Sequence, residues 1–202
     1  LRMSGLKWLA AILLLCAVGA QAEQRVAVCY NYGCLAQAEV VYDDRQLREL
    51  GEILAPAQDA AEERAAIAVA IGRLLGWAGK QSPIFADRGG NYDDDGVNGG
   101  MDCIDHSTTT TRLLRLIEGK GMLRFHHVLD PALRRRLFVF EHYSALIEER
   151  KPGSSDCGCD GEIEADPSKQ FVVDSWFFDN GHPAVVMPLA RWQSGESPNE
   201  NE

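Results

Sequence analysis

A lone cysteine behind a potential helix cap is the residue of this sequence best suited to chemistry. Cys103 follows Gly99-Gly100-Met101-Asp102, and aspartate is a preferred residue at helix N-caps. The unpaired N–H groups of a helix N-terminus favour the thiolate, which is the nucleophilic form of cysteine. The sequence therefore predicts a nucleophile at Cys103, and the alternative is a buried, unreactive thiol, as most free cysteines are.

A thiol nucleophile needs a base, and the base needs a group that orients it. His142 falls within an alternating stretch that is typical of a strand, which holds an imidazole rigidly. Asp174 stands within an apolar stretch, where a carboxylate requires a charged or donating partner. We expect His142 to be the base and Asp174 to orient it. The open alternatives are His126 or His127 as the base and an arginine among residues 134–136 as the partner of Asp174.

The same chemistry needs donors for the oxyanion that forms during attack on a carbonyl. The backbone N–H of Cys103 is one expected donor. A side chain upstream of it is the other, with Asn98 and Gln81 as equal candidates.

Three short stretches resemble the transglutaminase-like superfamily, and within it the bacterial transglutaminase-like cysteine proteinases. Met101-Asp102-Cys103-Ile104-Asp105-His106-Ser107 is similar to the Gly-Asp-Cys-Glu-Asp-Tyr-Ala signature of that group. His142-Tyr143-Ser144-Ala145-Leu146-Ile147 resembles its His-Ala-Val-Leu strand, and Phe171-Val172-Val173-Asp174-Ser175-Trp176 its Leu-Val-Leu-Asp-Asn strand. The resemblance spans about residues 45 to 180 and implies a papain-like fold with a Cys103, His142, Asp174 triad.

Two departures from that signature bear on calcium. Met101 replaces a glycine, and Ile104 replaces the acidic residue that can contribute to calcium binding in the group. A separate pattern does predict calcium: Asn91, Asp93, Asp95, Gly96 and Asp102 match positions 1, 3, 5, 6 and 12 of an EF-hand-type loop. The alternative is a solvated acidic loop with Asp102 serving only as a helix cap. The triad itself requires no cofactor, and calcium is an additional expectation.

The elements that must position these residues follow from caps and periodicity. Helices are expected from Asp43/Asp44 to Pro56, from Asp59 to about Trp77 and from Cys103 to about Glu118, with a polar loop over 80–101. Strands are expected over 122–129, 136–148, 171–178 and 184–189, after an extended, loop-like segment over 23–43. This order predicts an α+β fold with N-terminal helices packed on a C-terminal antiparallel sheet. One domain would span residues 23–192, with a disordered tail over 193–202.

The N-terminus reads as a secretion signal over residues 1–22. Arg2 and Lys7 precede the apolar run Leu9 to Val18, and Ala20-Gln21-Ala22 offers a cleavage site; the alternative is an uncleaved anchor. Removal of Arg2 and Lys7 leaves 18 of the 20 basic residues against 30 acidic ones, a net charge of −12. That charge argues against nucleic acid or an anionic membrane as partner. We expect a periplasmic or secreted protein with no stable membrane insertion after cleavage.

Five cysteines follow the expected signal: Cys29, Cys34, Cys103, Cys157 and Cys159. An oxidising compartment predicts two disulfides among the four outer cysteines and a free thiol at Cys103. Bonds within and across the pairs Cys29/Cys34 and Cys157/Cys159 are both open, and a four-cysteine zinc site is the rival interpretation.

Together these features predict an exported thiol hydrolase, a protease or amidase, that cleaves amide bonds of an envelope protein or peptide through an acyl-enzyme. The alternatives are a non-catalytic binding module of the same fold, with or without calcium; a protein cross-linking acyl transferase; and a peptidoglycan endopeptidase.

Overall fold

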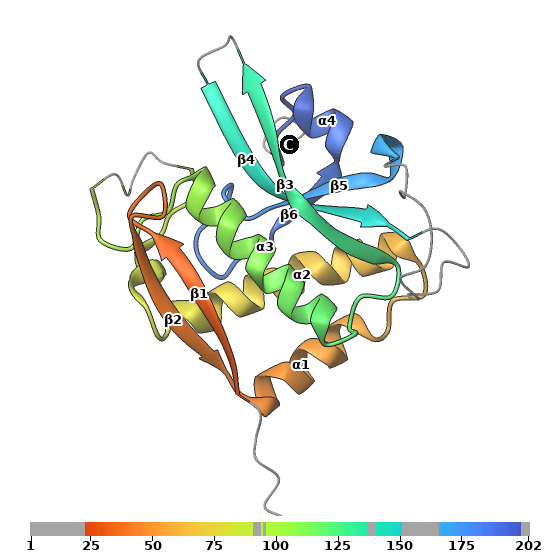
Figure 1. Ribbon diagram of the computed structural model, residues 1–202, viewed down its shortest axis with the longest axis horizontal. Coiled ribbons are helices and arrows are strands. Elements are labelled where there is room, and N and C mark those ends of the chain that lie inside the picture. Colours follow the sequence, from red (N-terminus) through yellow and green to blue (C-terminus); the bar gives the residue numbers. More distant parts are fainter. Residues whose placement is uncertain (1–22, 91–93, 95, 137–139, 151–165, 199–202) are drawn as a thin grey trace, which may run out of the picture.

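The computed structural model describes residues 23–90, 94, 96–136, 140–150 and 166–198. Several predicted features lie outside these residues: the signal segment 1–22, Cys157 and Cys159, and the calcium candidates Asn91, Asp93 and Asp95. They stay predictions. The described chain combines a two-stranded hairpin, four α-helices and a four-stranded antiparallel sheet (Figure 1).

The N-terminal segment is a hairpin. Strand β1 (Gln24–Tyr30) pairs antiparallel with β2 (Ala36–Tyr42) along its whole length. The segment over 23–43 is therefore extended, as expected, but it forms paired strands instead of a loop. Alternating buried side chains explain the strands, since Val26 and Val28 face the core from β1, and Val40 and Tyr42 from β2.

The three expected helices are confirmed. Helix α1 (Asp44–Leu54) begins after a capping box at Asp43, and α2 (Ala60–Gly79) begins after Asp59. Helix α3 (Cys103–Gly119) begins after Asp102, so Cys103 is its first residue. The expected loop between α2 and α3 also contains a short 3-10 helix, η1 (Pro83–Ala86).

The C-terminal sheet has the order β3-β4-β5-β6, and every pair of neighbours is antiparallel. Its strands are β3 (His126–Arg136), β4 (Phe140–Glu149), β5 (Gln170–Asp174) and β6 (Val185–Pro188). The 3-10 helix η2 (Pro167–Lys169) precedes β5. The strands were thus predicted in number and order, but β3 begins four residues later than expected and β5 ends four residues earlier.

The chain after β6 forms a short helix, α4 (Leu189–Gln193), instead of passing directly into a disordered tail. Trp192 is fully buried. Beyond it, the Glu196 carboxylate accepts hydrogen bonds from Arg191. The expectation of disorder from Gln193 onward is therefore wrong for residues 193–198.

Helix α3 lies between the hairpin and the large sheet (Figure 1) and contacts β1 on one side and β4 on the other. Its threonine run suits this position. Thr109, Thr110 and Thr111 are buried, and the Thr109 hydroxyl accepts a hydrogen bond from the backbone N–H of Cys29. Burial therefore offsets the low helix propensity of threonine. The mixed α+β class is confirmed, with the hairpin as an addition in front of the helices.

Candidate active site

Helix α3 begins with a capping box that fixes the backbone around Cys103. The Asp102 carboxylate accepts hydrogen bonds from the N–H groups of Ile104, at 3.0 Å, and Asp105, at 2.9 Å. The Asp105 carboxylate accepts in return from the N–H of Asp102. A reciprocal cap of this kind satisfies N–H groups that have no partner within the helix. Cys103 therefore occupies the first helical position with a well-determined backbone.

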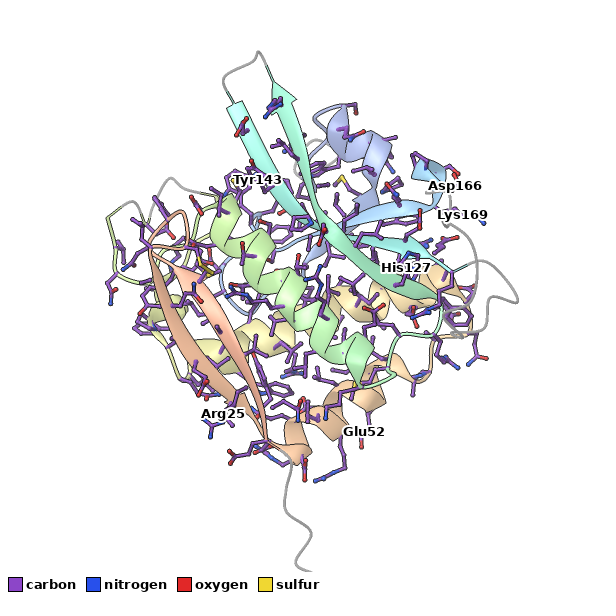
Figure 2. All side chains as sticks on the ribbon, in the orientation of Figure 1. Arg25, Glu52, His127, Tyr143, Asp166 and Lys169 are labelled. Atoms are coloured by element: carbon purple, nitrogen blue, oxygen red, sulfur yellow. A yellow bond between two sulfur atoms is a disulfide. The ribbon has the colours of Figure 1, made fainter. Side chains whose placement is uncertain are left out.

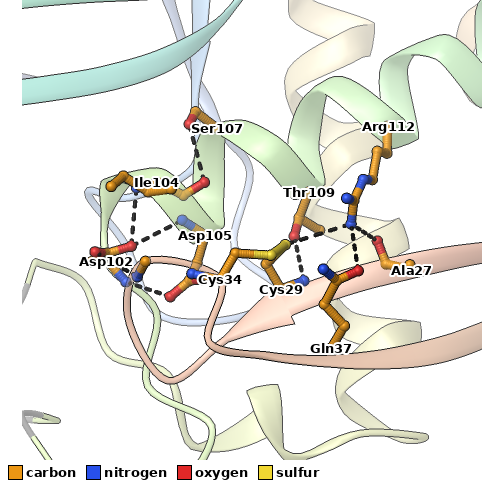
Figure 3. Close-up of a disulfide and its surroundings, with 11 residues drawn as sticks. Ala27, Cys29, Cys34, Gln37, Asp102, Ile104, Asp105, Ser107, Thr109 and Arg112 are labelled. Atoms are coloured by element: carbon orange, nitrogen blue, oxygen red, sulfur yellow. Dashed lines mark hydrogen bonds between the residues drawn. A yellow bond between two sulfur atoms is a disulfide. The ribbon is translucent and has the colours of Figure 1, made fainter.

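A disulfide-closed turn clamps this helix start from the hairpin side. Cys29 and Cys34 are bonded, and the turn between β1 and β2 has positive φ at four successive residues, Asn31 to Cys34. The N–H of Gly33 donates to Asp102, at 2.9 Å, and the N–H of Cys34 donates to Asp105, at 2.7 Å (Figure 3). Both carboxylates of the capping box are thus held by a second element.

The two carboxylates of the capping box lie close to each other, with an electrostatic consequence. Burial, together with the charge of Asp102, raises the pKa of Asp105 to about 6. The backbone N–H groups that donate to Asp105 act in the opposite direction. The start of α3 therefore contains a carboxyl group that titrates at mildly acidic pH.

On the sheet side of Cys103, His142 and Asp174 form a pair. His142 is on β4 and Asp174 is the last residue of β5, and their Nε2 and Oδ2 atoms are 2.8 Å apart. The indole N–H of Trp192 donates to the same Oδ2, at 2.9 Å, and the N–H of Trp176 donates to Oδ1, at 3.2 Å. Asp174 is only 2% exposed. Its carboxylate is therefore fixed by donors on both oxygens, as expected of a buried charge.

Three aromatic rings surround His142. The ring centroid of Trp176 is 4.7 Å from that of His142, the centroid of Trp192 is at 5.6 Å and that of Phe177 is at 6.0 Å. The rings exclude water from most of the imidazole, whose side chain is 11% exposed. Nε2 is engaged by Asp174, so Nδ1 is the ring nitrogen left for another partner.

The candidate for that partner is the thiol of Cys103, whose interaction with the imidazole is among the causes that raise the pKa of His142. Burial lowers the pKa of His142, but the hydrogen bonds to Asp174 and Cys103 outweigh burial and leave it raised. The sulfur also lies 3.9 Å from the backbone oxygen of Glu141. Cys103 is partly exposed and is not disulfide-bonded, as expected. The structure therefore brings the predicted cysteine, histidine and aspartate together.

The alternative bases are engaged elsewhere. His126 is fully buried and pairs with Glu63 of α2, at 2.8 Å, and His127 pairs with Glu148, at 3.1 Å. In Figure 2, Tyr143, which follows His142 on β4, lies beside the start of α3, whereas His127 lies toward the other end of the sheet.

The arginine alternative for Asp174 is wrong. The Asp174 carboxylate takes His142 and Trp192 as side-chain partners. Arg134 donates to the backbone oxygen of Trp192, and Arg135 donates to Glu141.

The two oxyanion candidates have other contacts. The Gln81 amide bridges the backbone N–H and C=O of Val41 on β2, at 2.9 Å each, so both of its polar atoms are used. Asn98 accepts a hydrogen bond from Asn31, at 3.2 Å. Gln81 therefore fastens the hairpin to the end of α2, and it is the weaker of the two candidates.

The described metal candidates are also engaged. Asp102 accepts its hydrogen bonds from the backbone of α3 and of the hairpin turn, which is the helix-cap role. Cys29, Cys34 and Asp105 lie close enough together to suggest a metal site, but the two sulfurs are bonded to each other. The four-cysteine zinc interpretation is therefore wrong. Calcium binding at Asn91, Asp93 and Asp95 stays a prediction.

Two tryptophans belong to this site but were not expected there. The indole N–H of Trp192 donates to Asp174. The ring of Trp176 packs on His142, and the backbone N–H of Trp176 donates to Asp174. A signal was present, because Trp176 and Phe177 lie two and three residues after Asp174 in the sequence. Nothing near Trp192 in the sequence indicates that it returns to the same carboxylate.

Comparisons with protein-family models, with curated proteins and with solved structures give no match for this chain. A search of the described helices finds none that combines the length and the apolar character needed to cross a membrane. The disulfide between Cys29 and Cys34 is typical of proteins from an oxidising compartment.

Proposed function

We propose that this protein is a thiol hydrolase that cleaves amide bonds through an acyl-enzyme on Cys103. The observation that carries the proposal is the position of His142. Its Nε2 lies 2.8 Å from the Asp174 carboxylate, the Cys103 sulfur lies 3.9 Å from the backbone oxygen of the preceding residue, Glu141, and Cys103 contributes to the raised pKa of His142. Nucleophile, base and orienting group in hydrogen-bonded sequence are the arrangement that activates a thiol for attack on a carbonyl.

In the proposed reaction, His142 Nδ1 takes the thiol proton as the sulfur bonds to the substrate carbonyl carbon. The C–N bond then breaks, and the imidazolium returns the proton to the leaving amine. A water molecule, deprotonated by His142, attacks the thioester and releases the acid, while the sulfur recovers its proton. Asp174 holds the imidazole through Nε2 throughout, and its two oxygens keep the donors that fix it.

The start of α3 supplies the electrostatic support for this chemistry. The N–H of Cys103, at the first helical position, has no acceptor within the helix. It is therefore suited to receive the developing oxyanion, with the positive end of the helix dipole behind it. The second donor that we propose is Asn98, because Gln81 is occupied by β2.

The proposed substrate is a protein or peptide of the cell envelope, and the proposed location is the periplasm or the extracellular space. The disulfide of the hairpin supports an oxidising location. Water is the abundant acceptor there, which favours hydrolysis over transfer to an amine. The resemblance of the three site stretches to transglutaminase-like cysteine proteinases supports the same reaction class.

Labelling with iodoacetamide, mapped by mass spectrometry on the full chain, tests the proposal. We expect selective labelling of Cys103 in the wild type, none at this position in Cys103→Ala, and strongly reduced labelling in His142→Ala. If wild type and His142→Ala label Cys103 equally, the thiol is not activated and the protein is a binding module of this fold.

A further inference from the structure

A second histidine–aspartate pair lies buried behind the start of α3. His106 is on α3, three residues after Cys103, and Asp87 lies in the loop after η1. Their Nε2 and Oδ2 atoms are 3.3 Å apart, and their side chains are 3% and 0% exposed. Within the described residues neither atom has a hydrogen-bond partner elsewhere. Each group therefore depends on the other for neutralisation.

The pair connects the loop before the thiol to the strand that carries Asp174. The other oxygen of Asp87 accepts a hydrogen bond from the N–H of Met101, two residues before Cys103, at 3.0 Å. The other ring nitrogen of His106 lies 2.9 Å from the hydroxyl of Ser175, the residue directly after Asp174. The Ser175 hydroxyl also lies 2.9 Å from that of Thr110 on α3.

Asp87 reaches a third segment through its backbone. Its C=O accepts a hydrogen bond from the N–H of Asn180, in the loop after β5. Nearby, the chain approaches so closely that a Cβ on Gly89 would lie 2.4 Å from the backbone oxygen of Phe177. The loops on either side of the pair are therefore packed with little freedom to shift.

Several carboxylates face His106. Burial lowers the pKa of His106, but Asp87, Asp174 and Asp105 together raise it. Burial is also the main cause that raises the pKa of Asp87. A buried pair of titratable groups is an expensive way to fill a core, since apolar residues of similar volume stabilise as well or better. A role beyond packing is the natural explanation.

We propose that Asp87 and His106 are positioning residues, which fix the loop of Cys103 relative to Asp174 and thereby set the contact between the thiol and His142. The inference rests on the proposed function. Neither residue needs to touch the substrate: Asp87 acts on the backbone at Met101, and His106 acts through Ser175.

The test compares Asp87→Asn with Glu63→Gln. Both changes replace a fully buried, histidine-paired carboxylate by an amide of nearly the same shape, but Glu63 pairs with His126. The readout is the rate of Cys103 alkylation by iodoacetamide across pH, measured below the melting transition of each variant. A loss of stability alone leaves the pH profile of folded molecules unchanged.

We expect Asp87→Asn to slow alkylation roughly 10- to 100-fold and to shift its pH profile, as a small misplacement of a catalytic group does. Glu63→Gln should keep the wild-type rate and profile. Equal profiles in Asp87→Asn and the wild type, or equal losses in both variants, would overturn the proposal.

Ser175→Ala covers the case in which Asp87→Asn does not fold, because it removes only one hydroxyl. Slower alkylation with a shifted profile supports the positioning role, and an unchanged profile overturns it. Failure of the proposed function is recognised separately: it shows as equal alkylation of wild type and His142→Ala, whatever the Asp87 and Ser175 variants do.

Discussion

Among the described residues, two of the histidine–carboxylate pairs have the same length but different surroundings. His142 and Asp174 are 2.8 Å apart, and so are His126 and Glu63. His126 is closed off: it is fully buried, and Arg64 lies 3.4 Å from its second nitrogen. His142 is slightly exposed, and its second nitrogen is available to a thiol. The two histidines therefore differ in the surroundings of the ring nitrogen that the carboxylate does not engage. This difference, and not the pair itself, distinguishes the candidate base from a structural histidine.

The carboxylates of the two pairs, Glu63 and Asp174, also differ in their hydrogen-bond partners. Glu63 accepts hydrogen bonds from the backbone N–H groups of Arg124 and Phe125, so it joins α2 to the segment that enters β3. Burial raises the pKa of Glu63, but the hydrogen bonds from His126 and these two amides outweigh it and leave the pKa lowered. Asp174, by contrast, is held by the indole of Trp192 and lies at the end of a strand. One carboxylate joins elements, and the other orients a ring.

The largest expected effect is on stability at the closed pair. His126→Ala leaves the Glu63 carboxylate buried beside an empty site, and breaking a buried pair in this way costs about 3–5 kcal/mol. His142→Ala should cost less. Each carboxylate keeps two other donors, but the His126 side chain is fully buried, whereas that of His142 is 11% exposed. Urea unfolding of both variants measures the difference. Equal losses would contradict the distinction between the two pairs.

Next in size is the effect of Asp174→Asn on reactivity. The hydrogen bond to Asp174 raises the pKa of His142, so Asp174→Asn should lower this pKa. A change of one pKa unit corresponds to an about tenfold change in proton affinity. We expect a roughly tenfold slower alkylation of Cys103 and a lower midpoint for the His142 ring resonances in an NMR titration. Glu63→Gln is the matched control and should leave that midpoint in place. An unchanged midpoint in Asp174→Asn would rule out Asp174 as the orienting group.

Removal of the hairpin disulfide should have a moderate effect. The double variant Cys29→Ala, Cys34→Ala frees a short turn, which costs about 2 kcal/mol on the chain-entropy model. Because the turn holds Asp102 and Asp105, both the alkylation rate of Cys103 and the melting temperature should decrease in this variant. Calorimetry and alkylation on the same samples measure both. A loss of stability with an unchanged rate would show that the turn does not position the thiol.

A smaller loss is expected from Trp192→Phe. The change keeps most of the apolar contact and removes the indole donor of Asp174, and a hydrogen bond to a charged group contributes about 1.5 kcal/mol or more. We expect a reduced free energy of unfolding, measured in urea, and only a slightly slower alkylation of Cys103. Wild-type stability in this variant would mean that the indole bond contributes nothing.

The smallest effects concern the pH dependence of stability, where the two regions have opposite signs. Asp105 has its pKa raised to about 6, so its contribution is full below the unfolded value near 3.8 and is lost as pH rises through about 6. Glu63 has a lowered pKa, so its contribution is present above about 4.5 and is lost as pH falls. Melting temperatures across pH should therefore show that Asp105→Asn flattens the change between pH 3.8 and about 6, and that Glu63→Gln flattens the change below pH 4.5. The same change in both variants would show that other groups dominate.

Much of the fold could be predicted because its signals are local. Asp43, Asp59 and Asp102 cap the three long helices, and the apolar periodicity after each one sets its length. The hairpin escaped prediction because its turn, Asn31 to Cys34, has four residues with positive φ, only one of them glycine. No short-range turn pattern of residue types predicts such a turn.

The candidate site could be predicted only in part, because local sequence patterns mark some of its residues and tertiary contacts determine the others. Cys103, His142 and Asp174 each carry a local signal: a cap, an alternating strand and a carboxylate in an apolar run. Trp192 and Asp87 act through contacts between distant segments. Trp192 contacts Asp174, and Asp87 contacts Met101 and His106. The partner of a buried polar group is set by tertiary packing, which the sequence around that group does not show.

The most direct test of the central claim, that His142 activates Cys103, is the rate of Cys103 alkylation by iodoacetamide in the wild type, His142→Ala and Glu63→Gln. We predict that His142→Ala slows the alkylation strongly and that Glu63→Gln keeps the wild-type rate. Equal rates in the wild type and His142→Ala would contradict the claim.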